Sequence, residues 1–198
     1  LVGSIHGSKI AQYLSGVNIK KEGLKNSGAS NAAVVLGAKY GILVAIIDIL
    51  KGVIVVIGTG FWVSQYAHFS IVEQDILLYS AGAAVILGHN FPLYTKFKGG
   101  KGVATSLGVL LLVNPLIGGI CLVFALTVMA LTRMVSLGSI MAAVLFPVLT
   151  IFIEDGYIAD GYTYIIFGIA MAALVIFNHR SNLKRIYNGT ENRLSFKK

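Results

Sequence analysis

Seven stretches of the chain carry few charged residues, and shorter polar stretches separate them. The apolar segments are Leu1–Leu14, Gly41–Val63, Ile76–Leu87, Val103–Val113, Leu116–Leu131, Val135–Ile153 and Tyr162–Phe177. Long apolar runs are typical of helices that cross a membrane. The pattern predicts an all-α integral membrane protein, a bundle of about seven transmembrane helices.

Two of these segments are short for a membrane crossing. A full span needs about 20 residues at about 1.5 Å each, and Ile76–Leu87 and Val103–Val113 have barely half of that. We expect them to recruit residues of the flanking loops, to thin the bilayer or to line a water-filled cavity. The chain begins with leucine, and we expect its first helix to be truncated at the N-terminus. No linker divides the sequence, so residues 1–198 are expected to form a single domain.

The composition supports a membrane protein. Hydrophobic residues make up 56% of the chain and charged residues only 12%, whereas a typical soluble domain has about 25% charged residues. Too little polar surface remains to cover a water-soluble globule, which excludes a soluble enzyme. Cys121 is the only cysteine, which excludes an internal disulfide and a zinc site built from cysteines.

Basic residues alternate between the loops. The loops after the first, third, fifth and seventh apolar segments hold 14 of the 16 Lys and Arg residues, and the intervening loops hold none. The intervening loops contain Glu73, Asp75, Glu154, Asp155 and Asp160. Because Lys and Arg mark cytoplasmic loops, this alternation predicts an N-terminus outside and a C-terminus in the cytoplasm.

Asp48 and Lys51 are charged residues inside an apolar segment. They are three positions apart and therefore share one face of a helix. One interpretation is a structural pair whose charges neutralise each other. The alternative is a proton or ion relay, since ionisable residues at membrane depth are often functional.

A glycine-rich sequence precedes the apolar segment that begins at Val103. Gly99, Gly100 and Gly102 surround Lys101. Glycines let successive N–H groups point into one concavity, and a helix N-terminus and a lysine add positive charge. The sequence therefore predicts an anion site, most naturally for phosphate. It is not a P-loop, because Gly102 stands where Ser or Thr is required; the alternative is a basic loop that only sets the topology.

Two further polar stretches lie on the predicted cytoplasmic side. One is Asn26–Asn31, and the other is Asn178–Arg185, in which His179, Asn182 and Arg185 share a face if the stretch is helical. Each alone is typical of an ordinary turn or of a basic patch that binds anionic lipid. Three such stretches on one side predict a polar active site at the cytoplasmic membrane surface.

Two longer motifs include these stretches. Gly88–Thr105 contains GH-x-FP and KFKGGKGVAT, and Asn178–Glu191 reads NHR-x-N-x-x-R-x-x-x-G-x-E. They resemble the second and third motifs of the acyl-phosphate:glycerol-3-phosphate acyltransferase family (PlsY type). The resemblance implies a seven-helix enzyme of the bacterial inner membrane. It also implies transfer of a fatty acyl group from an acyl phosphate to the sn-1 hydroxyl of glycerol 3-phosphate. The products would be lysophosphatidic acid and phosphate, in the first step of bacterial phospholipid synthesis.

The first motif departs from the family pattern, which is roughly GSGN-x-GATN-x-x-R. Here residues 23–34 read GLKNSGASNAAV, so Leu24 replaces a serine and Val34 an arginine. The resemblance implies that both replaced residues help to hold the acceptor's phosphate. Lys25 is new to the motif and can supply part of the lost charge, although a lysine does not replace a bidentate arginine. The alternatives are an acyltransferase with a different acceptor and a non-catalytic carrier of anions or lipid phosphate.

The candidate residues suggest that catalysis works by positioning the two substrates. The sequence contains neither a recognisable Ser-His-Asp arrangement nor an H-x-x-x-x-D signature, but an acyl phosphate is already activated, so orienting both substrates can suffice. The residues assigned to catalysis are Lys101, Ser136, His179 and Asn182. The residues assigned to substrate binding are Lys25, Asn26, Ser30, Asn31, Gly99, Gly100, Gly102, Thr105 and Arg185. A structural role is expected for His89, Glu191, Asp48 and Lys51.

Expected partners are the two substrates and membrane lipid, with no nucleic acid, metal or other cofactor.

Overall fold

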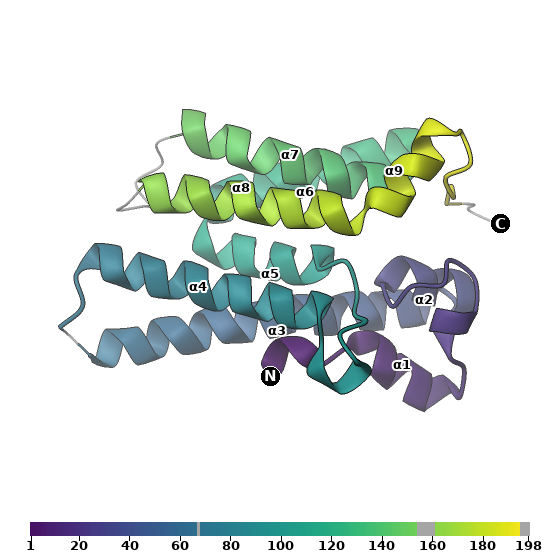
Figure 1. Ribbon diagram of the computed structural model, residues 1–198, viewed down its shortest axis with the longest axis horizontal. Coiled ribbons are helices and arrows are strands. Elements are labelled where there is room, and N and C mark those ends of the chain that lie inside the picture. Colours follow the sequence, from purple (N-terminus) through teal and green to yellow (C-terminus); the bar gives the residue numbers. More distant parts are fainter. Residues whose placement is uncertain (67, 154–160, 195–198) are drawn as a thin grey trace. The chain divides into compact units, whose positions relative to one another are not determined.

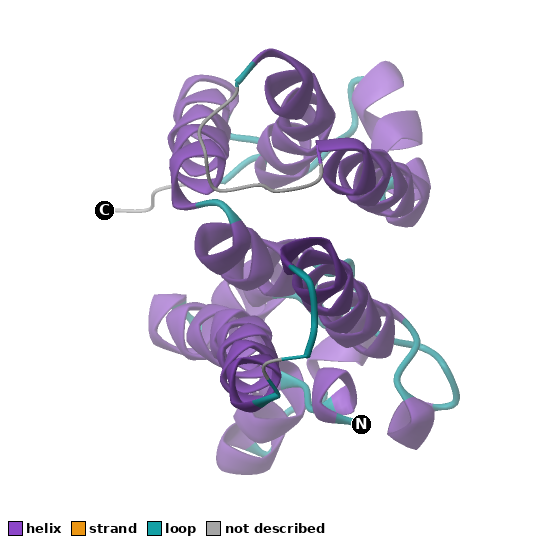
Figure 2. Ribbon diagram, turned by 90° about the vertical axis from the view of Figure 1, so that its left-hand side faces the viewer, coloured by secondary structure: helices purple, strands orange, loops and turns teal. Residues whose placement is uncertain are grey.

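In the computed structural model, which describes residues 1–66, 68–153 and 161–194, the chain folds into helices joined by loops (Figures 1 and 2). The described residues contain no strand, which confirms the predicted all-α class. Contacts divide the chain into two compact units, Leu1–Leu112 and Val113–Lys198.

The first unit contains five α-helices and three short 3₁₀ helices within its described residues. In chain order these are η1 (Val2–Ser4), α1 (Gly7–Ser15), η2 (Ile19–Lys21), α2 (Ala29–Leu36), α3 (Ala38–Gln65), α4 (Ile71–Asn90), η3 (Leu93–Thr95) and α5 (Val103–Val113). Helix α3 is the longest and contacts α1, α2 and α4. A small core of Ala11, Ile19, Ala32 and Val44 lies where α1 and α2 meet α3.

The start of α4 explains how a short apolar segment becomes a long helix. Ser70 accepts a hydrogen bond from the Glu73 N–H, and the Glu73 side chain accepts one from the Ser70 N–H. This reciprocal capping satisfies two N–H groups that a helix start leaves without partners. The helix therefore begins five residues before Ile76 and reaches 20 residues, as expected from recruitment of the flanking loop.

Helices α3 and α5 approach closely at two glycines. A Cβ at Gly52 of α3 would lie 2.6 Å from the Thr105 carbonyl oxygen, and one at Gly108 of α5 would collide with the Ile49 carbonyl. Small residues let membrane helices bring their backbones together in this way. This contact fixes the first turn of α5, where the predicted anion site lies.

The second unit contains α6 (Pro115–Thr132), α7 (Val135–Phe152), α8 (Gly161–Asn178) and α9 (Arg180–Tyr187). Asn114 caps α6 by accepting from the Ile117 N–H at 2.9 Å, and Pro115 occupies the first helical position. Both residues are favoured there, and the predicted Asn114-Pro115 break is confirmed. Helices α6 and α8 both pack against α7, with Phe146 in edge-on contact with Tyr164.

In the part of the chain that the structure describes, four helical segments are long and apolar enough to cross a membrane: Ala38–Gln65, Ile71–Thr95, Pro115–Thr132 and Val135–Phe152. A fifth is Tyr162–Asn178 taken together with Arg180–Tyr187, a pair bent by 61°. This count does not confirm seven crossings. The predicted first segment divides into η1 and α1, because Ile5 and His6 between them are extended, and α5 has only 11 residues. The acidic loop Glu154–Asp160 lies outside the described residues.

Candidate active site

The glycine-rich loop is tied to the end of α4 by its own backbone. The Gly99 N–H donates to the Asn90 carbonyl at 3.1 Å, and the Gly100 N–H donates to the His89 carbonyl at 3.2 Å. These two N–H groups anchor the loop and are not directed at a ligand. A phosphate site here would instead use Lys101 and the N–H groups that follow it.

The segment before the glycines is strained. Lys96 and Phe97 both have left-handed backbones, with φ values of 53° and 60°. Such conformations are unfavourable for residues with side chains, and they persist where surrounding contacts enforce them, often at functional sites. The Thr95 hydroxyl and the Lys20 ammonium both donate to the Lys98 carbonyl, at 2.9 and 2.7 Å. Together these bonds hold the loop in a single shape.

Lys20 is a loop anchor that sequence reasoning missed. It lies on η2 and reaches a carbonyl 78 residues away in the sequence, so no local pattern could reveal the contact. Burial, followed by the nearby charge of Lys9, lowers the pKa of Lys20 below the usual lysine value.

Lys101 is half-buried and directly precedes Gly102 and α5. Gly102 has φ of 84°, and a Cβ there would lie 2.6 Å from Oδ1 of Asn90, so only glycine fits this position without strain. The first internal bond of α5 runs from the Ser106 N–H to the Gly102 carbonyl at 2.7 Å. The N–H groups of the preceding turn have no acceptor within the helix. With Lys101 and the helix dipole they form the positively polarised end that an anion requires.

Three side chains near this end have buried polar atoms without a hydrogen-bond partner among the described residues. They are the amide of Asn90, which lies against Gly102, and the hydroxyls of Thr105 and Ser106 in the first turn of α5. A buried polar group without a partner costs stability. Thr105 was expected to bind substrate, whereas no sequence pattern singled out Asn90.

The first-motif loop is organised around Asn31. Its side chain is fully buried, accepts from the Leu24 N–H at 2.7 Å and donates to the carbonyls of Ile19 and Asn26 at 2.6 and 2.7 Å. The amide thus holds both ends of the loop, whereas Asn31 was assigned to substrate binding. No substrate contact is needed to explain why asparagine stands at this position.

The other first-motif candidates lie around that amide. Asn26 accepts from the Gly28 N–H at 2.9 Å and so shapes the turn before α2. Lys25 is exposed with φ of 53°, and Ser30 is half-buried in the first turn of α2. Val34 is 56% exposed, so its position has room for a longer side chain.

Asp48 and Lys51 form the expected buried ion pair, with the Lys51 ammonium 2.9 Å from Oδ1 of Asp48. The same ammonium lies 2.6 Å from Nδ1 of His89, at the end of α4. The pair is therefore not isolated, because it contacts the residue whose carbonyl holds Gly100.

The candidates of the second unit meet at Glu191. Its Oε1 accepts from the Ser136 hydroxyl and from the Asn182 amide, both at 2.7 Å, and its Oε2 accepts from Nε of Arg185 at 2.8 Å. Burial alone would raise the pKa of Glu191, but the hydrogen bonds from Ser136, Asn182 and Arg185 bring it below its usual value. Three residues predicted to contact substrate are thus oriented by one carboxylate that was expected to be structural.

His179 lies at the bend between α8 and α9 and is almost completely buried. Its Nδ1 lies 2.8 Å from the Val175 carbonyl oxygen. Since a carbonyl only accepts, Nδ1 carries the proton of the neutral ring. The stretch is helical from Arg180 to Tyr187, so Asn182 and Arg185 lie on α9, whereas His179 precedes it as its cap.

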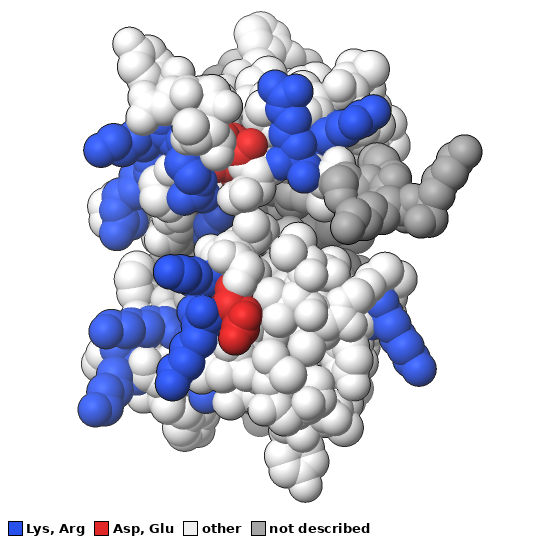
Figure 3. All heavy atoms as spheres, turned by 90° about the vertical axis from the view of Figure 1, so that its right-hand side faces the viewer, with Lys and Arg blue, Asp and Glu red and all other residues white. Residues whose placement is uncertain are grey.

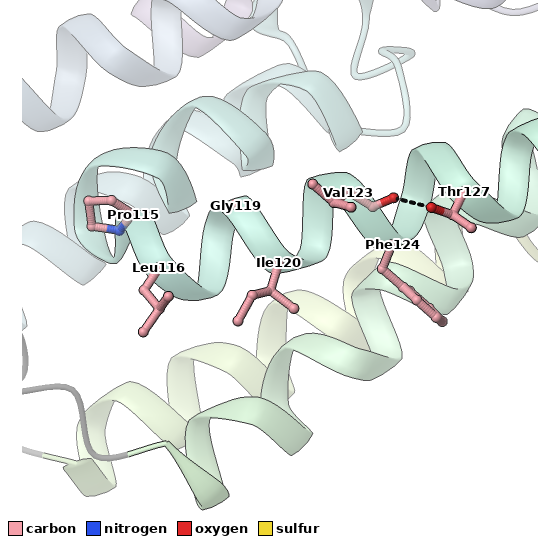
Figure 4. Close-up of a pocket in the computed structure, with 7 residues that line it drawn as sticks. All are labelled: Pro115, Leu116, Gly119, Ile120, Val123, Phe124 and Thr127. Carbon is pink, nitrogen blue, oxygen red and sulfur yellow. Dashed lines mark hydrogen bonds between the residues drawn. The ribbon is translucent and has the colours of Figure 1, made fainter.

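Figure 3 shows many Lys and Arg side chains and few Asp and Glu side chains on the surface that it draws. The pocket drawn in Figure 4 is different in character. It has a volume of about 570 Å³ and is lined by residues of α6 alone, from Pro115 to Thr127. None of its lining residues is charged, so it offers nothing that would hold a phosphate.

Comparisons with known proteins agree with the family resemblance found in the sequence. Residues 1–189 match the family described as Glycerol-3-phosphate acyltransferase. Relatives with that name from Thermoanaerobacter sp. (strain X514) and Clostridioides difficile (strain 630) are 41% and 39% identical, cover all of this chain, and are themselves covered over 92% and 93% of their lengths. A relative from Fusobacterium nucleatum is 40% identical, with 98% of this chain and 94% of the relative covered.

Two crystal structures of PlsY, an integral membrane glycerol 3-phosphate acyltransferase, are also similar. They represent a glycerol 3-phosphate form and a lysophosphatidic acid form, with TM-scores of 0.84 and 0.82. Both are 35% identical and cover 98% of this chain, while 91% of each known chain is covered. The chain therefore belongs to the glycerol-3-phosphate acyltransferase family of integral membrane proteins.

Proposed function

We propose that this chain transfers a fatty acyl group from an acyl phosphate to the sn-1 hydroxyl of glycerol 3-phosphate, releasing lysophosphatidic acid and phosphate. The observation that carries the proposal is the glycine loop with Lys101 at the start of α5, in a chain that matches glycerol-3-phosphate acyltransferases over its whole length. Both substrates bear phosphate, and this helix end is suited to phosphate.

The reaction balances without a protein nucleophile. The acceptor's hydroxyl oxygen attacks the acyl carbonyl carbon, and the bond between that carbon and the bridging phosphate oxygen breaks. The acyl group becomes an ester, and the electron pair of the broken bond leaves with the phosphate. The hydroxyl proton passes to an oxygen of that phosphate, so the donor supplies the base.

The protein's part is then to orient and to stabilise charge. Lys101 and the first-turn N–H groups of α5 are suited to the phosphate on which charge grows as the bond breaks. Ser136 and Asn182 are each fixed at 2.7 Å from Glu191, and a group that is already oriented loses less entropy when it positions a substrate. We assign these two residues, with His179 and Arg185, to substrate positioning.

The proposed location is the bacterial inner membrane, with the active site at the cytoplasmic face. Among the described residues, each apolar segment overlaps one α-helix, and these are α1, α3, α4, α5, α6, α7 and α8. In the proposed topology all seven cross the bilayer or lie within it. The alternation of basic loops supports an N-terminus outside and a C-terminus inside.

The donor is the part of this proposal that most needs an experiment. Detergent-purified protein would receive glycerol 3-phosphate and either palmitoyl phosphate or a palmitoyl thioester, and lysophosphatidic acid would be measured by mass spectrometry. We expect product from the acyl phosphate alone. Product from the thioester alone would overturn the donor assignment. A protein that binds both substrates but forms no product would be the non-catalytic carrier.

A further inference from the structure

A buried cluster of ionisable residues contacts the Gly99–Gly102 loop. Asp48 and Lys51 of α3 and His89 of α4 are exposed by only 2, 4 and 3%. The Lys51 ammonium lies 2.8 Å from the Ile5 carbonyl oxygen, 2.9 Å from Oδ1 of Asp48 and 2.6 Å from Nδ1 of His89. The cluster therefore joins the turn after η1, helix α3 and the end of α4.

The contacts of Lys51 determine where His89 carries its proton. An ammonium has three hydrogens and no lone pair, so it can only donate. Its three close neighbours are two oxygens and one ring nitrogen, and Nδ1 of His89 must accept. Asp48 does not compete for that nitrogen, because its Oδ1 lies 3.6 Å from Nδ1, beyond hydrogen-bond length. A neutral ring that accepts at Nδ1 carries its hydrogen on Nε2.

The other edge of the ring faces the loop. A Cβ at Gly100 would collide with Nε2 of His89, so the N–H edge of the ring lies against the Gly100 backbone. The carbonyl of the same histidine accepts from the Gly100 N–H at 3.2 Å. His89 thus holds the loop through its backbone and abuts it with its ring.

A metal ion is a weaker explanation of this cluster. The ligand atoms of His6, Asp48 and His89 lie within 4.8 Å of one another, which invites the idea of a metal centre. However, the Lys51 ammonium already bonds the Asp48 carboxylate and the free lone pair of His89. A divalent cation would have to displace it or lie beside its positive charge.

We infer that Asp48 and Lys51 are positioning residues of the reaction, which act through His89. They hold the His89 ring with its Nε2–H directed at the Gly99–Gly102 loop, and this fixes Lys101 and the start of α5 for the phosphate. The inference rests on the proposed function. It favours the structural interpretation of the Asp48–Lys51 pair over a proton or ion relay. The two charges neutralise each other and also orient His89, and no proton needs to move along the pair.

The first test reads the tautomer and is independent of activity. The wild-type protein would be labelled with ¹⁵N-histidine, and the ring nitrogens would be observed by NMR at neutral pH, with His89 assigned through the His89→Gln variant. We expect a proton on Nε2 and none on Nδ1. A proton on Nδ1, or on both nitrogens, overturns the inference even if every variant folds poorly.

The second test uses the reach of two amide side chains. Gln at position 89 can place an amide N–H near the place of Nε2, whereas Asn reaches only the place of Nδ1. We expect His89→Gln to keep kcat within about threefold and His89→Asn to lose at least tenfold, about 1.4 kcal/mol of activation free energy. Equal losses, or the reverse order, contradict a role for Nε2–H.

The third test removes both charges of the pair, because removing one would leave the other buried and unpaired. Asp48→Asn with Lys51→Met should lower kcat at least tenfold and change the KM for glycerol 3-phosphate less than threefold. The matched control is Lys39→Met, since Lys39 is an exposed lysine on the same helix. A folded double variant with the control's kcat overturns the inference. If the wild type forms no product, the proposed function fails, while the tautomer still decides the positioning role.

Discussion

The hydroxyl of Ser136 donates a hydrogen bond to Oε1 of Glu191 at 2.7 Å, although 55 residues separate the two along the chain. The same oxygen accepts from the Asn182 amide. Ser136 is therefore oriented by a carboxylate that is shared with other donors, an arrangement suited to presenting a polar group at a fixed place. Glu191, at the end of the third motif, therefore orients residues on both α7 and α9.

The Glu191 network predicts a specific dependence of stability on pH. The folded-state pKa of Glu191 lies below its reference value of 4.5, so its contribution is complete above that value and is lost as pH falls through the folded pKa. Glu191→Gln should lower the unfolding free energy at pH 7 by about 1.5–3 kcal/mol. The ion pair with Arg185 contributes little to this free energy, because the Arg185 side chain is 37% exposed. The difference should shrink towards pH 3.

Thermal unfolding in detergent between pH 3 and pH 7 measures this effect. Glu22→Gln serves as the control, because Glu22 is an exposed carboxylate. A Tm difference between wild type and Glu191→Gln that stays constant across the range would mean that the carboxylate charge does not stabilise the fold.

Lys101 should matter for turnover more than for folding. Lys101→Ala removes a charge-assisted contact to phosphate, worth about 1.5–3 kcal/mol, and should lower kcat/KM by about 10–150-fold. Lys98→Ala is the matched control, since the Lys98 side chain is exposed and only its backbone carbonyl is used by neighbours. Steady-state rates with an acyl phosphate would separate the two variants. An unchanged rate in folded Lys101→Ala would exclude this loop as the phosphate site.

The altered first motif predicts weak binding of glycerol 3-phosphate. Val34 is 56% exposed and offers no charge where the family pattern has arginine. Restoring the pattern with Val34→Arg and Leu24→Ser should lower the KM for glycerol 3-phosphate about tenfold, or about 1.4 kcal/mol. The KM for the acyl phosphate should hardly change.

Kinetics with each substrate varied in turn would test that prediction, with Lys25→Ala as a companion variant. If the restored motif leaves the acceptor's KM unchanged while Lys25→Ala raises it, Lys25 has replaced the arginine. If neither change has an effect, the first motif does not hold the acceptor's phosphate.

The proposed orientation can be tested with single cysteines on opposite sides. Cys121 is buried and should give little background labelling. His68→Cys, in the loop between α3 and α4, should react with an impermeant maleimide added outside intact cells. Lys184→Cys, on α9, should react only after the membrane is opened. The opposite pattern would reverse the topology.

The sequence predicted most of the fold because apolar periodicity and breaks are local properties. The Asn114-Pro115 break was readable because a capping residue acts on its own turn. The extent of α4 was not readable, because the Ser70–Glu73 capping adds a polar turn to an apolar segment.

Contacts across long sequence separations account for what was missed at the site. Lys51 was recognised as a partner of Asp48, three residues away, but not of His89, which lies 38 residues away. Lys20 was seen only as a basic loop residue, and its bond to the Lys98 carbonyl depends on tertiary structure. The glycines suggested free N–H groups, whereas those of Gly99 and Gly100 are used by the end of α4.

Phosphate release tests the central claim most directly. Purified wild-type protein would receive an acyl phosphate with and without glycerol 3-phosphate, and inorganic phosphate and lysophosphatidic acid would both be quantified over time. We predict one phosphate for each lysophosphatidic acid formed, with little phosphate released when the acceptor is omitted. Phosphate released at the same rate without the acceptor, or no release at all, would contradict acyl transfer by this chain.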